Sequence, residues 1–128
     1  MNIEEFKYDK VLTEEMSIEL AQSDGELKIK GNQSYDKLVG YMMLVHDSDG
    51  NLFAKQVKVS LSDVATGDAI LPLQPYDSIR PSMMEKPADR VIKTNVRANG
   101  TDFKFRVESK AHTSALRFTV VAFVTNKK

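Results

Sequence analysis

Apolar and polar residues alternate along much of the chain with a period of two, which is the pattern of β-strands buried on one face. The clearest case is residues 90–109, where Asn99-Gly100 separates two alternating runs. An Asn-Gly pair favours a two-residue turn of type I′, because both of its positions take a positive φ. The sequence therefore predicts an antiparallel hairpin that pairs Val96 with Phe103 and has one apolar and one polar face.

Two more turn signals predict hairpins in the first half of the chain. Residues 16–30 have Asp24-Gly25 at their centre, and their apolar positions agree across a two-residue turn. Residues 40–61 surround the polar run 47–51. Residues 41–45 of that hairpin are apolar on both faces, which is expected of a strand that is central in the fold or covers an external contact.

The remaining segments predict an edge strand and a final strand. Proline cannot donate a hydrogen bond to a neighbouring strand, so residues 69–74, which contain Pro72, are expected at the edge of a sheet. Residues 115–125 place alternate apolar side chains on one face and are expected to form the last strand. Residues 3–15 fit an arm, a strand or one helical turn.

Together these runs predict seven or eight short strands with frequent turn signals and no long helical period, which is typical of an all-β antiparallel β-sandwich. Two-residue hairpins join neighbours within one sheet and so favour an immunoglobulin-like or meander arrangement. A jelly roll, in which many sequential strands lie in opposite sheets, is the alternative. We expect a single sandwich domain over residues 16–128, preceded by an acidic arm over residues 1–15.

The composition is that of one globular domain and excludes several classes of protein. The chain has 128 residues, of which 41% are hydrophobic and 28% charged, close to the globular average. It has no cysteine, which excludes a disulfide scaffold, a thiol nucleophile and a zinc site built on thiolates. No apolar run approaches about twenty residues, and residues 1–10 lack an apolar stretch. We therefore expect no membrane span, no secretory signal and synthesis in the cytoplasm.

The formal net charge of +0 hides a strong asymmetry between the two ends. Residues 1–26 carry eight acidic and two basic side chains, a net −6, whereas residues 90–128 carry nine basic and two acidic ones, a net +7. The two segments either neutralise each other within one chain, or the acidic end of one copy meets the basic end of its neighbour. A contact of the second kind is heterologous and builds rings or open arrays.

No catalytic, cofactor or metal site is expected, so we expect a protein that is not an enzyme. The run 47–50 begins like a calcium loop, but Lys58 occupies the twelfth position, where an EF-hand needs glutamate. His46 and His112 lack the partners of a catalytic triad and the spacing of a metal site. Adjacent carboxylates such as Glu14-Glu15 are expected to be solvated and therefore unsuited to general acid–base catalysis.

The run 103–106 interleaves aromatic and basic side chains, as strands that bind single-stranded nucleic acid do. The predicted hairpin, however, turns both phenylalanines of this run toward the core. Its opposite face would carry a basic stripe of Lys93, Arg97, Lys104 and Arg106. A chain without net charge is poorly suited to bind phosphates, so single-stranded nucleic-acid binding is only the third hypothesis for function.

Contact with other protein subunits is the interaction that the sequence favours. Residues 76–89 predict a long loop with two adjacent methionines, a residue type that adapts well to contact surfaces. The charged termini and the two-sided apolar run 41–45 are the other candidates. The residues expected to interact are Met83, Met84, Pro81, Pro87, Tyr76, Tyr41, Glu4, Glu5, Lys127 and Lys128.

These features favour a non-catalytic structural protein that packs against copies of itself or against other assembly proteins. At the level of fold, a small cysteine-free sandwich resembles the minor capsid, cement or attachment subunits of phages, so a virion is the expected assembly. The alternative is a small ligand-binding or carbohydrate-binding sandwich, which would need exposed aromatic rings at Tyr35, Tyr41 and Tyr76. Neither a membrane nor a small molecule is expected as the partner of the structural protein.

Overall fold

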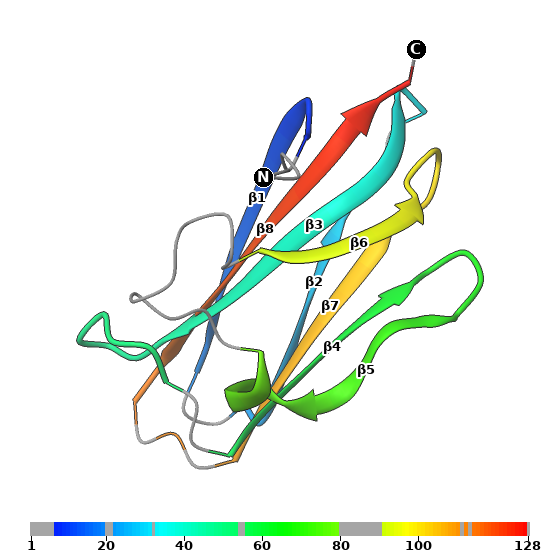
Figure 1. Ribbon diagram of the computed structural model, residues 1–128. Coiled ribbons are helices and arrows are strands. Elements are labelled where there is room, and N and C mark those ends of the chain that lie inside the picture. The colour runs from blue at the N-terminus through cyan, green and yellow to red at the C-terminus, as the bar shows by residue number, and fades with distance from the viewer. Residues whose placement is uncertain are drawn as a thin grey trace, which may run out of the picture.

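The computed structural model describes residues 7–19, 22–31, 33–53, 56–79, 91–110, 112 and 114–127 of the chain. These residues form eight strands in two four-stranded antiparallel sheets that pack face to face (Figure 1). The all-β sandwich predicted from the sequence is therefore confirmed. The elements are β1 (Lys10–Ile18), β2 (Asp24–Ile29), β3 (Tyr35–His46), β4 (Val57–Asp63), β5 (Ala69–Pro75), the short 3₁₀ helix η1 (Tyr76–Ser78), β6 (Ile92–Arg97), β7 (Phe103–Ser109) and β8 (Leu116–Asn126).

The strand order is that of a jelly roll. The first sheet has the order β1-β8-β3-β6 and the second sheet the order β2-β7-β4-β5. Among the described strands, β4 and β5 are the only pair that is consecutive in the chain and also hydrogen-bonded. At each of the other connections the chain crosses to the opposite sheet, which is the jelly-roll arrangement. The favoured immunoglobulin-like or meander arrangement is thus wrong, and the alternative is the one found.

The hairpin expected around Asn99-Gly100 does not form. A turn is present at these residues, but it is not the predicted type I′, because Gly100 has a positive φ and Asn99 does not. β6 lies in the first sheet and β7 in the second, so Val96 does not pair with Phe103. Gly100 has a φ of +69°, as the turn signal indicated. The prediction failed because the inner faces of both sheets contact one shared core. A strand on the opposite sheet therefore shows the same alternation as a hairpin partner.

The other two predicted hairpins fail for the same reason. The run 47–51 does form a turn, in which Asp47 Oδ1 accepts hydrogen bonds from the backbone N–H groups of Asp49 and Asn51. The turn is closed by a single antiparallel bridge between His46 and Leu52. Beyond it the chain leads to β4 in the opposite sheet, so the longer pairing predicted for residues 40–61 does not form. Asp24-Gly25 is not a turn but the start of β2, where Gly25 is buried opposite Val107.

The two strands expected at the end and at the edge of the fold are found. β5 contains Pro72 and lies at the edge of the second sheet, as proline requires. β8 is paired on both sides, with β1 and with β3. β1 begins at Lys10, so the strand crosses the boundary predicted at residue 15 and its residues belong to the first sheet.

The core lies between the two sheets and is built from the alternate residues that the sequence pattern indicated. Tyr41, Phe103, Phe105 and Phe118 are among its largest fully buried side chains. A further core residue, Tyr76, comes from η1 and reaches β3 on the side that β6 no longer covers, because the β3–β6 pairing stops at Tyr41. Its hydroxyl donates to the carbonyl oxygen of Met43 at 2.7 Å and accepts from the N–H of Val45 at 3.2 Å. One side chain thus satisfies two backbone groups that a strand would otherwise pair.

The opposite charges of the two ends meet within one chain. β1 pairs with β8 and β2 pairs with β7, so the acidic N-terminal strands lie beside strands of the basic C-terminal segment. Arg117 Nε is 2.9 Å from Glu15 Oε1, and Arg106 Nη2 is 3.3 Å from Asp24 Oδ2. Of the two explanations for the charge asymmetry, these contacts support neutralisation inside the fold. The asymmetry therefore no longer argues for contacts between copies.

Candidate functional site

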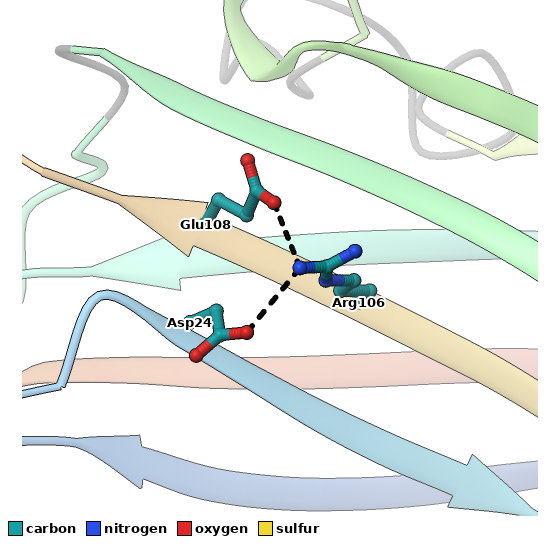
Figure 2. A network of polar contacts seen from close by, with 3 residues as sticks. All are labelled: Asp24, Arg106 and Glu108. Atoms are coloured by element: carbon teal, nitrogen blue, oxygen red, sulfur yellow. Dashed lines mark hydrogen bonds and ion pairs between the residues drawn. The ribbon is translucent and has the colours of Figure 1, made fainter.

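The two outward faces of the sandwich differ in chemistry. The outer face of the second sheet is charged. Its centre is a network in which Arg106 Nη2 lies 3.3 Å from Asp24 Oδ2 and 2.9 Å from Glu108 Oε1 (Figure 2). Arg106 Nε is buried and has no hydrogen-bond partner in the described part of the chain. The carboxylates hold only one end of this guanidinium. The other outward side chains of β2, β4 and β7 are polar, namely Glu26, Lys28, Lys58, Ser60, Ser62 and Lys104, whereas the edge strand β5 adds Leu73, which is 45% exposed.

The outer face of the first sheet carries an apolar patch. On β3 and β8 the inward residues, such as Met43 and Val120, are buried in the core, so the alternate residues face outward. Met42 lies opposite Val121 in the register of these two strands, and both are partly exposed. We define the outer apolar patch as Tyr8, Val11, Met42, Leu44, Val121 and Phe123.

The patch is continuous across three strands. Phe123 lies opposite Val11 of β1, and its ring contacts the ring of Tyr8 edge to face, with 4.9 Å between the centroids. Phe123 is only 8% exposed, whereas Val11 is 42% and Tyr8 46% exposed. The middle of the patch is therefore already packed, and its rim is open to solvent.

Charged side chains border the patch. The pair Glu15 and Arg117 lies at one end, and both side chains are more than half exposed. On the other side, Lys93 and Arg97 of β6 are exposed. Apolar surface with a charged border is typical of a protein-contact site.

The sequence indicated only part of this patch. Residues 41–45 were predicted to be central or to cover an external contact, and β3 is central, between β8 and β6. Val11, Val121 and Phe123 also belong to the patch, but they were not among the residues predicted to make contacts. The available signal was the mixed outer face of the last strand, where two apolar residues follow Arg117 and Thr119 at period two.

Tyr41 and Tyr76 lie in the core and not at a surface, so the contacts expected at these two residues are wrong. Tyr76 is 0% exposed and Tyr41 is 2% exposed. The ring of Tyr41 packs edge to face on Phe105, and burial raises the pKa of its hydroxyl to about 12. Tyr35 is also buried. The three aromatic rings considered for carbohydrate binding are thus unavailable.

The other residues expected to make contacts are only partly described. Lys127 is exposed, and its backbone N–H donates to the carbonyl oxygen of Ser34. It borders a hollow of about 610 Å³ whose other charged lining residues are Lys7, Asp9, Asp36 and Lys37. Because both lysines and aspartates line this hollow, it does not favour a ligand of either charge. Met83, Met84, Pro81, Pro87, Glu4, Glu5 and Lys128 lie outside the described residues, and the predictions for them stay predictions.

The predicted basic stripe does not exist. Lys93 and Arg97 lie on β6 in the first sheet, whereas Lys104 and Arg106 lie on β7 in the second sheet. All four point away from the shared core, so the two pairs are on opposite outer faces of the sandwich. The stripe was predicted from the hairpin around Asn99-Gly100, and because that hairpin does not form, the stripe does not form either.

The described residues contain no cluster of three or more His, Cys, Asp or Glu side chains that could hold a metal ion. The ring of His112 links two segments. Its Nε2 donates to the carbonyl oxygen of Glu19 at 3.0 Å, so its Nδ1 accepts from the hydroxyl of Ser109 at 3.1 Å.

A hollow of about 510 Å³ near β4 and β5 is bordered by side chains of both charges, Lys58, Lys110, Asp77 and Glu108. In the described part of the chain no helix is long and apolar enough to cross a membrane.

Comparison of the sequence with protein-family models and with curated proteins found no match.

Proposed function

We propose that this chain is a non-catalytic assembly subunit that packs through the outer apolar patch against another protein surface, copies of itself included. The single observation that carries the proposal is the contrast between the two outer faces. The central strand β7 of one sheet carries a network of paired charges on its outer side. The central strands of the other sheet place Met42, Leu44 and Val121 in partly exposed positions there. A sheet with one solvated side needs polar residues there, so apolar residues at these positions favour a contact.

The patch has the composition expected at the centre of an interface. A stable interface buries roughly 800 Å² on each partner and places apolar and aromatic residues at its centre, with charges at the rim. Tyr8, Val11 and Met42 would supply apolar area, while Lys93 and Arg97 would lie at the border. Covering the patch would remove this area from water at a gain of about 25 cal/mol per Å².

A virion is the assembly that we propose, as a minor capsid, cement or attachment subunit. Jelly rolls occur in viral capsid domains, so the strand order supports this proposal by analogy of fold. Jelly rolls also occur in lectins. A lectin-like function is not favoured, because Tyr35, Tyr41 and Tyr76 are all buried.

The test is to place a charge on each outer face in turn. Leu44→Glu and Val121→Glu introduce a carboxylate into the patch, and Ser62→Glu introduces one on the outer face of the second sheet as the matched control. All three side chains point away from the core, so the fold should persist. Light scattering after size-exclusion chromatography, over a range of protein and salt concentrations, measures the assembly.

We expect the wild type and Ser62→Glu to assemble with rising concentration, and the two patch variants to assemble at least about 100-fold more weakly, because an unpaired charge would be buried. A wild type that stays monomeric at high concentration and low salt would contradict packing against copies of itself. Equal assembly by Leu44→Glu and wild type would contradict the role of the patch.

A further inference from the structure

β1 is an edge strand of the first sheet, and its pairing is more regular than that of the other edge strands described. Its nine residues pair with β8 without a register shift, and they include neither proline nor glycine. The other side of β1 has no strand partner among the described residues. Half of its backbone N–H and C=O groups therefore point away from the sheet, as they do along any edge strand.

The three other edges are less suited to accept a strand. β5 contains Pro72, and its pairing with β4 shifts register twice. The pairing of β6 with β3 is interrupted between Leu38 and Gly40. β2 has six residues and includes Gly25. Prolines, irregular pairing and short length are among the features that protect edges from intermolecular pairing, and β1 has none of these three. It does carry charged residues, a further protective feature, so a strand can pair with β1 only in a register that matches those charges.

We propose that β1 pairs with β1 of a second copy across a two-fold axis, which joins the two first sheets into one continuous sheet of eight strands. The second copy is the occupant because residues 10–14 of β1 complement themselves in one register, with Lys10 opposite Glu14. This contact uses the backbone edge of β1. It shares Val11 with the outer apolar patch but does not use Met42, Leu44 or Val121, so it can hold or fail independently of the proposed function.

The two faces of β1 restrict the register. Leu12, Glu14 and Met16 lie opposite Ala122, Val120 and Phe118, which are buried in the core. Even-numbered residues of β1 therefore lie on the inner side of the sheet. In a continuous antiparallel sheet, two residues that lie opposite each other on neighbouring strands point to the same side. Even-numbered residues of β1 must therefore lie opposite even-numbered residues of the second copy.

Charge then selects one register among those that remain. When the two-fold axis passes at Leu12, Lys10 of each copy faces Glu14 of the other, and Leu12 faces its own equivalent. An axis at Glu14 would instead place two like charges face to face, and an axis at Thr13 would place Leu12 opposite Glu14. The axis at Leu12 also brings Asp9, one residue before β1, level with Glu15 of the other copy, but Arg117 already pairs with Glu15 within each chain. Lys10 and Glu14 are both exposed, and neither forms an ion pair within the described part of the chain. Opposite charges that face each other across strands stabilise the pairing, and like charges oppose it.

Single cysteines provide the sharpest test, because the natural chain has none. At the proposed axis the two Leu12 residues are directly opposed, which places their Cα atoms roughly 4.5–5.5 Å apart, within the range of a disulfide. Leu12→Cys should therefore form a covalent dimer under mild oxidation. Ser17→Cys is the control on the same strand, since the two copies of residue 17 would be about 33 Å apart.

A charge exchange tests the same register at exposed positions, where folding is not at risk. Glu14→Lys places two lysines opposite each other twice per dimer and should weaken dimerisation about five- to thirty-fold. Combining Glu14→Lys with Lys10→Glu restores opposite charges and should recover the wild-type dimerisation constant to within about threefold. Analytical ultracentrifugation measures the constants, and circular dichroism confirms that each variant is folded.

The proposal is overturned if folded Leu12→Cys cross-links no faster than Ser17→Cys, or if Thr13→Cys cross-links faster than both. It is also overturned if the double charge variant dimerises as weakly as the single one. Introducing Leu44→Glu into the Leu12→Cys chain separates the two proposals. Cross-linking should be unchanged there, because the patch variant disrupts only the proposed function.

Discussion

The hydroxyl of Tyr76 is the contact whose removal should reveal most about how this sandwich is held together. Tyr76 is fully buried, and its hydroxyl hydrogen-bonds Met43 O at 2.7 Å and Val45 N at 3.2 Å. Both backbone groups belong to β3, beyond the last β3–β6 pair at Tyr41 and Ile92. The substitution Tyr76→Phe keeps the ring and removes only the oxygen that replaces a strand at this position.

The expected cost follows from the two groups left behind. A buried backbone donor or acceptor without a partner costs roughly 1–3 kcal/mol. With two such groups, and some relaxation around the lost oxygen, we expect Tyr76→Phe to lower the free energy of unfolding by about 2–4 kcal/mol. The entropy of unfolding is roughly 2.1 cal/mol/K per residue, or about 0.27 kcal/mol/K for 128 residues. The melting temperature should therefore fall by about 7–15 °C.

Tyr41→Phe is the matched control, since it removes a hydroxyl from a second buried tyrosine. Tyr41 packs its ring on Phe105, and its hydroxyl makes no hydrogen bond within the described part of the chain. We expect this variant to stay within about 0.5 kcal/mol of the wild type. Urea unfolding at neutral pH, analysed by linear extrapolation, measures both variants. If Tyr76→Phe is no less stable than Tyr41→Phe, the hydroxyl does not replace a strand and the reasoning fails.

Three further predictions concern stability. In Gly31→Ala the added Cβ would clash with the carbonyl oxygen of Thr101, so we expect the free energy of unfolding measured in urea to fall by about 3 kcal/mol or more. Gly50→Ala is the control: it has a φ of +84° and open space around it, and it should lose only about 1 kcal/mol. Equal losses in the two variants would refute the close approach at Gly31. The pKa of Tyr41 is raised from 10.0 to about 12 in the folded chain, so above pH 10 the unfolded chain releases this proton first. The resulting loss of stability between pH 10 and pH 12 should be smaller in Tyr41→Phe, as pH-dependent unfolding would show. Arg117→Gln breaks the pair with Glu15, in which both side chains are more than half exposed; it should change the free energy of unfolding by less than about 1 kcal/mol, and a larger effect at moderate salt would contradict that estimate.

Residues that face the core could be identified from the sequence alone. Phe103 and Phe105 in one run, and Phe118 and Val120 in another, were expected to lie on an apolar face, and all four are buried. The edge position of the strand with Pro72 was likewise predicted. These features depend on local geometry, because alternation follows from the pleat of a strand and proline lacks an N–H wherever it is placed.

The candidate surfaces required the tertiary structure. The basic stripe failed because Arg97 and Lys104 lie in different sheets, and the apolar patch was hidden because Val11 and Phe123 are neighbours only through the pairing of β1 with β8. The proposed contact at the edge of β1 depends on the same pairing, which leaves one side of β1 without a strand partner among the described residues.

The sequence by itself determined the class of fold, the inward side of most strands and the positions of two of the three predicted turns. Only the tertiary structure decided which strands pair. The physical reason is that both sheets of a sandwich bury their inner faces in one core, so the alternation of a strand identifies its apolar face but not its neighbours. A turn signal such as Asn99-Gly100 is equally local: it sets the backbone conformation at Gly100, with a φ of +69°, whether the next strand returns beside the first or crosses to the opposite sheet.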